Sequence, residues 1–210
     1  MTLDTNWVVS WISAAADSIA EHRQELNTLD REIGDGDHGE NMDRGLRAAV
    51  EALGKLPDGS TPNAVLRSVA MTLISTVGGA SGPLYGTAFL KAAEPVGDAP
   101  AIDASTLVAL LTAARDGIVS RGKAELGDKT MVDAWTPAVE AAAAAESAGA
   151  ADAEVLAAAA DAADRGAEAT VPLVARKGRA SYLGERSAGH LDPGARSTAL
   201  LLRAAAGAAG

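Results

Sequence analysis

Apolar residues recur at helical spacing through most of the chain. Near the N-terminus, Trp7, Trp11, Ala15 and Ile19 follow one another at intervals of four, which predicts a helix from about residue 5 to residue 31. The same spacing, together with helix caps and turn residues, predicts seven further helices, over about residues 41–55, 61–77, 83–93, 105–119, 131–147, 152–175 and 197–206. Thr61 and Ser105 are the expected N-caps of two of them, and Pro172 is expected to bend the 152–175 helix.

The composition agrees with this pattern. Hydrophobic residues make up 48% of the chain but aromatic residues only 3%, and the apolar content is mainly alanine, leucine and valine. Alanine and leucine favour helices, whereas β-branched and aromatic residues favour strands. We therefore predict an all-α fold in which small side chains let the helices approach closely.

The connections between the helices are mostly short, which favours an up-and-down antiparallel bundle or barrel formed by residues 1–210 as a single domain. In such a topology, successive loops alternate between the two ends of the molecule. The loops that follow the first, third, fifth and seventh helices therefore share one end, and they are the glycine-rich and polar segments 32–40, 78–82, 120–130 and 176–196. We expect the chemistry of the protein at that end.

Charge and residue usage limit the classes of function. The formal net charge is -10, which argues against a nucleic-acid surface, because binding to the phosphate backbone requires clustered lysine and arginine. No cysteine is present, so disulfides and thiolate metal sites are excluded. The N-terminus lacks a basic segment and carries Asp4, unlike a secretory signal, and no apolar run is long enough to span a membrane. We expect a cytoplasmic protein with no membrane association.

The segment DREIGDGDHG places Asp30, Asp35 and Asp37 close together among glycines. Carboxylate oxygens are typical ligands of Mg²⁺, and the glycines permit a tight turn that folds back on Asp30. A dinucleotide-binding fingerprint is excluded because a helix rather than a strand precedes it, and an EF-hand because the required ligand positions do not match. An exposed acidic turn remains the alternative. His38 is a candidate for phosphate contact, stacking on a base or acid–base chemistry. The alternatives are a histidine that only supports the metal ligands and one that is simply exposed.

Two of the other loops supply complementary chemistry. The glycines of segment 78–82 and the start of the helix that follows form a candidate anion cradle, although a tight helix–helix turn is an alternative. Segment 176–196 concentrates five basic residues in an otherwise acidic chain, which suits an anionic ligand. Asp128-Lys129-Thr130 is similar to the phosphorylated motif of cation pumps, but its continuation differs and a helix N-cap is the alternative. A metal turn, an anion cradle and a basic loop together predict a Mg-nucleotide site.

Four segments are similar to one known family. LDREIGDGDHGENMDRG (29–45), SVAMTLISTVGGASGPLYGTAFLKAA (68–93), RGKAELGDKTMVDAW (121–135) and ARKGRASYLGERSAGHLDPGARS (175–197) resemble the nucleotide-binding L subunit of dihydroxyacetone kinases. The resemblance implies an eight-helix antiparallel barrel with ADP or ATP and two Mg²⁺ at one end. It implies that the metal ligands are Asp30, Asp35 and Asp37, and that the nucleotide lies against His38, Gly39, Asn41, Ala80, Ser81, Gly122, Met131, Arg179, Asp192, Pro193 and Gly194.

The resemblance also implies a phosphotransferase with a division of labour. A separate K subunit would hold dihydroxyacetone, and this chain would supply the γ-phosphoryl group. The favoured mode keeps ADP bound and rephosphorylates it from a phosphotransferase-system protein. The alternatives are an ATP-dependent kinase subunit for dihydroxyacetone or another short ketose, and a regulatory nucleotide-binding module that docks onto a transcription regulator. A homodimer is a further candidate assembly.

Overall fold

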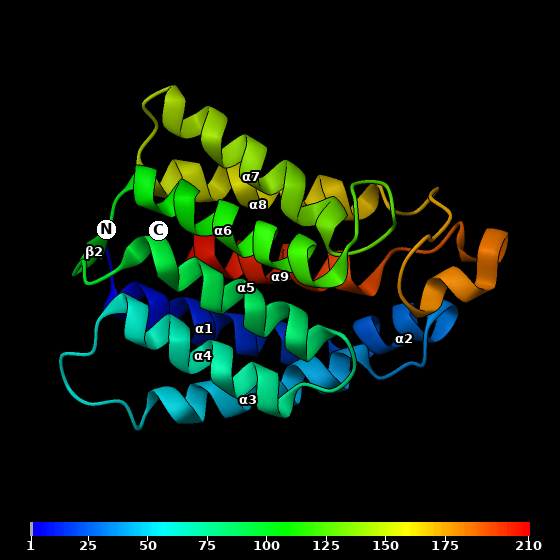
Figure 1. The fold of residues 1–210 in the computed structure, drawn as a ribbon, viewed down its shortest axis with the longest axis horizontal. Helices are drawn as coiled ribbons and strands as arrows, with labels where there is room; N and C mark the ends of the chain where they lie inside the picture. The colour runs from blue at the N-terminus through cyan, green and yellow to red at the C-terminus, as the bar shows by residue number, and fades with distance from the viewer. Residues whose placement is uncertain (1) are drawn as a thin grey trace.

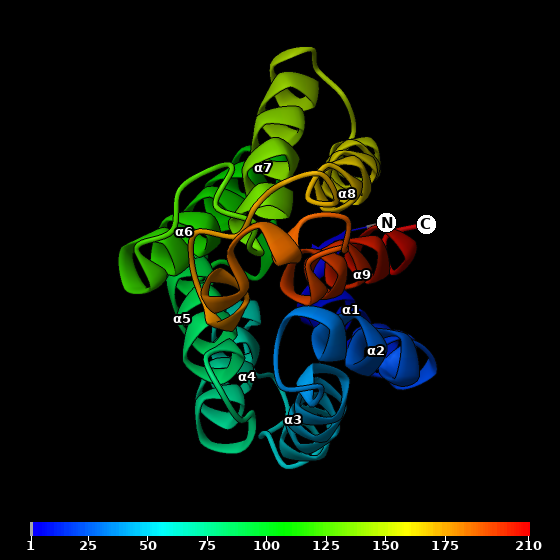
Figure 2. The ribbon, with the colours of Figure 1, turned by 90° about the vertical axis from the view of Figure 1, so that its right-hand side faces the viewer.

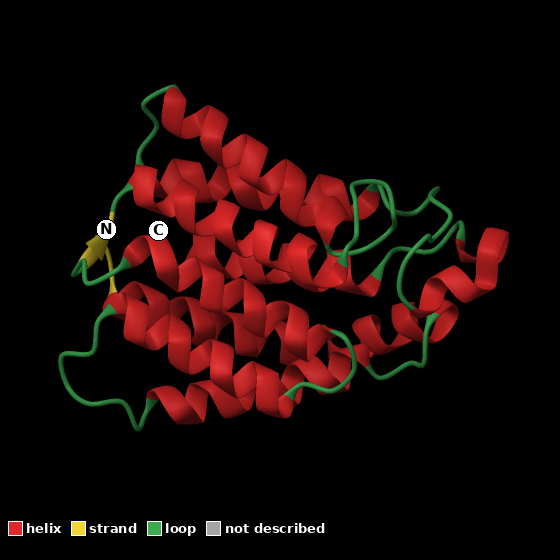
Figure 3. Ribbon diagram, viewed as in Figure 1, coloured by secondary structure: helices red, strands yellow, loops and turns green. Residues whose placement is uncertain are grey.

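The computed structural model describes residues 2–210, and most of them are helical (Figures 1 and 3). The helices are α1 (Thr5–Glu21), α2 (Arg23–Ile33), α3 (His38–Leu53), α4 (Pro62–Thr76), α5 (Ser81–Val96), α6 (Ala104–Gly122), α7 (Val132–Ser147), α8 (Asp152–Glu168), η1 (Arg179–Ser187, a 3₁₀ helix) and α9 (Pro193–Gly207). Two short strands, β1 (Leu3–Asp4) and β2 (Ala101–Ile102), pair antiparallel beside the N-terminus. Among the described residues, no helix is long and apolar enough to cross a membrane.

The helices form a closed ring. Each of α3 to α9 packs against the helix before or after it in sequence, and α1 packs against both α3 and α9, so that the first and last helices complete the circle. Figure 2 looks along the barrel and shows this arrangement. Because consecutive helices run in opposite directions, the predicted all-α antiparallel barrel is confirmed, with α1 and α2 together forming its first arm.

Tryptophans of α1 close the ring. The rings of Trp7 and Trp11 stack with their centroids 5.3 Å apart, and Trp11 also lies against Phe89. The indole nitrogen of Trp7 donates to the carbonyl of Ala205 at 3.2 Å, and that of Trp11 to Leu201 at 2.9 Å. Buried indole N–H groups need such partners. The same two side chains therefore fill the interior and bind α1 to α9.

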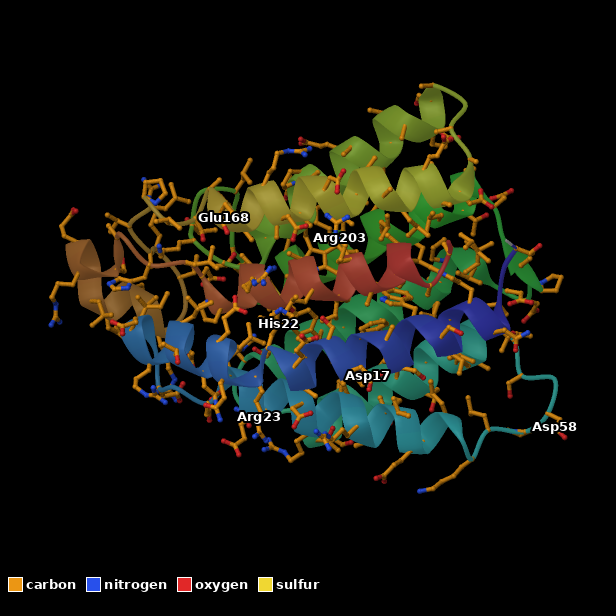
Figure 4. All side chains as sticks on the ribbon, turned by 180° about the vertical axis from the view of Figure 1, so that it is seen from behind. Asp17, His22, Arg23, Asp58, Glu168 and Arg203 are labelled. Atoms are coloured by element: carbon orange, nitrogen blue, oxygen red, sulfur yellow. The ribbon has the colours of Figure 1, made fainter. Side chains whose placement is uncertain are left out.

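The single helix predicted over residues 5–31 is wrong, because the chain interrupts it at His22. The backbone of His22 has φ -92° and ψ 8°, outside the helical region. Its ring Nδ1 lies 2.8 Å from the carbonyl of Ser18, one turn earlier. Figure 4 labels His22 at this junction. The second part, α2, then continues to Ile33 and carries Asp30 to the end of the barrel.

Other boundaries also differ from those predicted. Helix α8 ends at Glu168, before Pro172, rather than bending and continuing to residue 175, because proline disfavours helical backbone at the preceding residue. Helix α9 begins at Pro193 rather than 197, because Asp192 caps it by accepting from the amide of Ala195 at 2.7 Å. Helix η1 lies inside a segment predicted to be an irregular loop.

The two predicted N-caps have different outcomes. The Thr61 side chain accepts from the amide of Ala64, as expected for the cap of α4. Ser105 is not the cap of α6, because the helix begins one residue before it. The side chain of Asp103 accepts instead, from the amide of Thr106 at 2.8 Å. An aspartate two residues upstream therefore takes the role that the sequence pattern assigned to the serine.

Glycine allows the closest approach of α7 and α8. A Cβ atom added to Gly166 would lie 2.3 Å from the backbone oxygen of Asp133, which cannot move aside without shifting α7. We predict that Gly166→Ala lowers the free energy of unfolding by about 1–3 kcal/mol, because overpacking against backbone forces the helices apart. Urea denaturation followed by circular dichroism measures this change.

Gly54 offers the matched control. Its backbone has φ -65° and ψ -9°, and an added Cβ would have its nearest neighbour at 3.6 Å. Gly54→Ala is expected to leave stability unchanged or to raise it by about 0.4–1 kcal/mol through the unfolded chain. Equal destabilisation by both substitutions would contradict the assignment of Gly166 to close helix packing.

Candidate functional site

Segments from all four predicted loops line one cavity. It opens at the end of the barrel that faces the viewer in Figure 2. The residues that line it come from segments 30–38, 78–84, 129–131, 177–180 and 192–194. These segments are far apart in the sequence, and the alternation of helix direction brings them together.

Four helices begin at this cavity. His38 opens α3 and Ser81 opens α5, Met131 directly precedes α7, and Pro193 opens α9, and all four residues line the cavity. The first amides of a helix have no partner within the helix, and the helix dipole places partial positive charge there. The cavity is therefore surrounded by groups that favour an anion, in a protein whose net charge is negative.

The three aspartates lie together at the rim of this cavity. Asp30, Asp35 and Asp37 each offer a carboxylate oxygen, and these oxygens lie within 4.8 Å of one another. Oδ2 of Asp30 accepts hydrogen bonds from the backbone amides of Gly36, Asp37 and His38 at 2.9, 2.9 and 3.1 Å. Asp30 is nearly buried and Asp35 and Asp37 are exposed. One carboxylate thus shapes the turn that carries the other two.

The residues of this turn suit a hard cation. A Cβ atom on Gly34 would lie 2.1 Å from Oδ1 of Asp30, so only glycine leaves this second oxygen uncovered. Gly36 has φ +82°, a backbone conformation that favours glycine. Three carboxylates held this close repel one another, and a divalent cation with oxygen ligands relieves that repulsion. The arrangement fits Mg²⁺, with Asp30, Asp35 and Asp37 as its protein ligands.

His38 is buried and both of its ring nitrogens are engaged. Nε2 lies 2.8 Å from the hydroxyl of Ser197, and Nδ1 lies 3.2 Å from that of Ser81. Burial lowers its pKa to about 4, although Asp30 and Asp37 act in the opposite direction. The ring is therefore neutral at physiological pH, with one nitrogen donating and the other accepting. The exposed alternative is wrong, and this environment does not favour a free general base.

The glycine-rich loop 78–82 is a tight turn between two helices, and it lies at the cavity. Gly79 has φ +65°, and a Cβ atom on Gly82 would lie 2.3 Å from the backbone oxygen of Val77. These glycines make the tight turn between α4 and α5 possible. The turn also presents Ala80 and Ser81 to the cavity at the N-terminus of α5. The tight turn and the candidate anion cradle are thus one structure.

The basic loop divides between the cavity and the outer surface. Lys177 and Arg179 line the cavity, and the guanidinium of Arg179 lies 3.0 Å from a carboxylate oxygen of Asp35. Arg196 instead pairs with Glu25 at 2.8 Å on the outside of α9. Arg179 therefore stands directly beside the aspartate cluster, and its predicted contact with phosphate requires the anion to lie next to the metal ligands.

Three predicted residues do not line the cavity. A Cβ atom on Gly39 would lie 2.2 Å from the backbone oxygen of Arg23, so this glycine permits α3 to pack on α2. Asn41 is buried, and its side-chain oxygen accepts from Arg44 at 2.6 Å. Gly122 is the last residue of α6. The assignment of these residues to the nucleotide remains a prediction from the family resemblance.

The structure gives Lys129 a role that the motif Asp128-Lys129-Thr130 did not predict. Its side chain is 1% exposed, and its ammonium donates to the carbonyls of Thr170 at 2.7 Å, of Val171 at 3.4 Å and of His190. Burial lowers its pKa, against the influence of Asp192 and Asp133. The backbone of Lys129 has φ +63°. Lys129 thus ties the loop before α7 to the two ends of the long loop after α8.

Three aspartates fix the same region. Asp133 accepts from the amides of Gly127 and Thr130 at 2.5 and 2.7 Å, which folds the loop before α7. Asp128 accepts from the amide of Glu125 and is not a helix cap. Burial raises the pKa of Asp192, which caps α9 and lines the cavity, to about 7. Within the motif Asp128-Lys129-Thr130, Lys129 and Thr130 therefore form part of the cavity wall, and Asp128 folds the loop behind it.

Comparison with known proteins identifies the family. Residues 32–207 match the DAK2 domain. The chain belongs to the DAK2 domain family. The chain is 43% identical over 203 residues to the ADP-binding subunit DhaL of the PEP-dependent dihydroxyacetone kinase of Escherichia coli strain K12, covering 97% of this chain and 96% of that protein. It is 45% identical over 204 residues to the corresponding subunit of kinase 1 of Listeria innocua, with the same coverage.

A solved structure shares the fold. The dihydroxyacetone kinase of C. freundii, determined in complex with AMP-PNP and Mg²⁺, aligns with 99% of this chain at a TM-score of 0.73 and 27% identity. The aligned region is 34% of that kinase. In that protein, the DAK2 fold is thus one part of a longer chain, whereas the DhaL subunits match this chain over nearly their whole length.

Lys129 supplies a test of how the cavity wall is held. We predict that Lys129→Met, which keeps the length and apolar character of the side chain, lowers the free energy of unfolding by about 2–4 kcal/mol, because it leaves buried carbonyls without donors. The exposed Lys123, which also has a positive φ (+53°), is the matched control. Lys123→Met should leave stability within about 0.5 kcal/mol of the parent. Equal effects in thermal denaturation would contradict the anchoring role.

Proposed function

We propose that this chain is the nucleotide-binding L subunit of a two-component dihydroxyacetone kinase. The observation that carries the proposal is the aspartate cluster, whose three oxygens lie within 4.8 Å beside a cavity surrounded by helix N-termini. Carboxylates bind Mg²⁺, and helix N-termini bind phosphate. A Mg-nucleotide contains both Mg²⁺ and phosphate, so it can bind the carboxylates and the helix N-termini at the same time. The similarity to DhaL subunits over nearly the whole chain supports the same function.

Different residues would bind the metal ions, the phosphates and the nucleoside. Asp30, Asp35 and Asp37 would hold two Mg²⁺, which neutralise charge on the phosphates during transfer. The amides at the start of α5 and α9, around Ser81 and Gly194, would bind phosphate oxygens. Arg179, beside Asp35, would reach the terminal phosphate, since a guanidinium matches phosphate oxygens in pairs. Met131 would cover the nucleoside.

The acceptor and the phosphoryl donor belong to other proteins. The relatives are described as ADP-binding subunits of PEP-dependent kinases. We therefore infer that a separate K subunit presents dihydroxyacetone at the mouth of the cavity, and that a phosphotransferase-system protein restores the γ-phosphoryl group on bound ADP. In this mode ADP is a coenzyme rather than an exchanged product.

The coenzyme mode predicts retained nucleotide. Protein purified without added nucleotide is expected to release close to one equivalent of ADP on acid precipitation, measured by mass spectrometry. In the alternative mode, ATP exchanges freely and the purified protein releases little nucleotide. Transfer to dihydroxyacetone in the presence of the K subunit and added ATP, but without phosphotransferase-system proteins, would then contradict the coenzyme mode.

The metal ligands are tested by substitution. We predict that Asp35→Asn abolishes Mg-dependent ADP binding, because an amide replaces one of the three charged ligands. Asp58, an exposed aspartate in the loop at the opposite end of the barrel, provides the control (Figure 4). Asp58→Asn makes the same change in net charge and should bind Mg-ADP like the parent. Isothermal titration calorimetry measures both variants.

Comparison with Asp58→Asn distinguishes the loss of a metal ligand at Asp35 from a change in the net charge of the protein. If Asp35→Asn binds Mg-ADP with unchanged affinity, the assignment of the aspartate cluster to magnesium is wrong. If the parent protein binds Mg-ADP but transfers no phosphoryl group in the presence of a K subunit loaded with dihydroxyacetone, the kinase proposal is wrong.

A further inference from the structure

We propose that Tyr85, Ser197 and Thr198, none of which lines the cavity, form a buried hydroxyl network that positions the phosphate-binding helix ends through His38. The inference rests on the proposed function of this site and assigns it three positioning residues. These residues lie on α5 and α9, one turn inward from the cavity.

The network is continuous from one cavity wall to the other. The Tyr85 hydroxyl lies 2.7 Å from that of Ser197 and 2.9 Å from that of Thr198, and it donates to the carbonyl of Gly194 at 3.2 Å. Ser197 continues the path to Nε2 of His38 at 2.8 Å, and Nδ1 of His38 meets Ser81 at 3.2 Å. The two ends of the network, Ser81 and Gly194, both line the cavity.

The network connects helices that are not neighbours in the ring. Helix α5 packs between α4 and α6, α9 between α8 and α1, and α3 between α1 and α4. Helix α3 touches α5 only lightly, and the three helices otherwise pack against different ring neighbours, so this packing sets the separation of the N-termini of α3, α5 and α9 mainly indirectly. The hydroxyl network joins these three ends directly, across the interior of the barrel, close to where they face the cavity.

Burial strengthens the hydrogen bonds of this network. Tyr85, Ser197 and Thr198 are each 0% exposed. Hydrogen bonds away from water are strengthened by the low local dielectric, and a partner left unpaired there is costly. A role in packing alone requires only the ring of Tyr85. Its hydroxyl has three polar partners, the hydroxyls of Ser197 and Thr198 and the carbonyl of Gly194. Ser197 in turn contacts His38, so the oxygen of Tyr85 rather than its ring links the helix ends.

The first experiment removes only that oxygen. Tyr85→Phe is expected to weaken Mg-ADP binding by about three- to tenfold in calorimetry, because the N-termini of α5 and α9 lose their fixed spacing. Tyr182→Phe makes the same change on a side chain that is 88% exposed and should bind like the parent. A loss of stability without a change in affinity would assign Tyr85 to packing and overturn the inference.

The second experiment asks whether the effect travels through the network. In a Ser81→Ala background, Tyr85→Phe should weaken binding by less than about twofold, because the end of the network is already cut. Thr198→Ser, which keeps the hydroxyl, should bind more tightly than Thr198→Ala. Equal effects of Tyr85→Phe in both backgrounds would overturn the inference. Failure of the parent protein to bind Mg-ADP would instead overturn the proposed function, and this inference with it.

Discussion

The direction of the helices is the constraint on which the site depends. In a closed ring of antiparallel helices, every second helix begins at the same end, so α3, α5, α7 and α9 all present their N-termini to one cavity. The unpaired amides and dipoles of four helices create a positive region in an acidic protein. The hydrogen bonds of Trp7 and Trp11 to α9 join the first helix to the last. The ring is then closed, and the four helix N-termini lie around one cavity.

The aspartate turn completes this region with charge of the opposite sign. Oδ2 of Asp30 accepts three backbone amides, which leaves Oδ1 beside Gly34 for another partner. Metal ligands and phosphate-binding helix ends therefore lie on adjacent walls. A Mg-nucleotide matches both walls at once, because its cations meet the carboxylates while its phosphates meet the helix N-termini. Lys129 and the hydroxyls around Tyr85 fix the segments that form these walls, and none of them belongs to the aspartate turn.

Local patterns predicted the helices because helical periodicity is a short-range property. The shared end of the four loops followed from the short connections, which favour antiparallel neighbouring helices. The aspartates were also found from a local pattern, since they are close in sequence. The interruption at His22 was missed because Leu26 resumes the apolar spacing of Ile19 two helical turns later, which is consistent with one continuous helix. The contacts of Lys129 and Ser197 were not predicted, because these partners are 41 to 61 and 112 to 159 residues away and no local signal encodes such contacts.

The most direct test of this account is a crystal structure of the protein with ADP and Mn²⁺, a cation that takes the same oxygen ligands as Mg²⁺ and scatters anomalously. The account predicts anomalous peaks among the carboxylates of Asp30, Asp35 and Asp37, with the phosphates of ADP between them and the N-termini of α5 and α9. Manganese bound away from these carboxylates, or ADP bound at another face of the barrel, would contradict it.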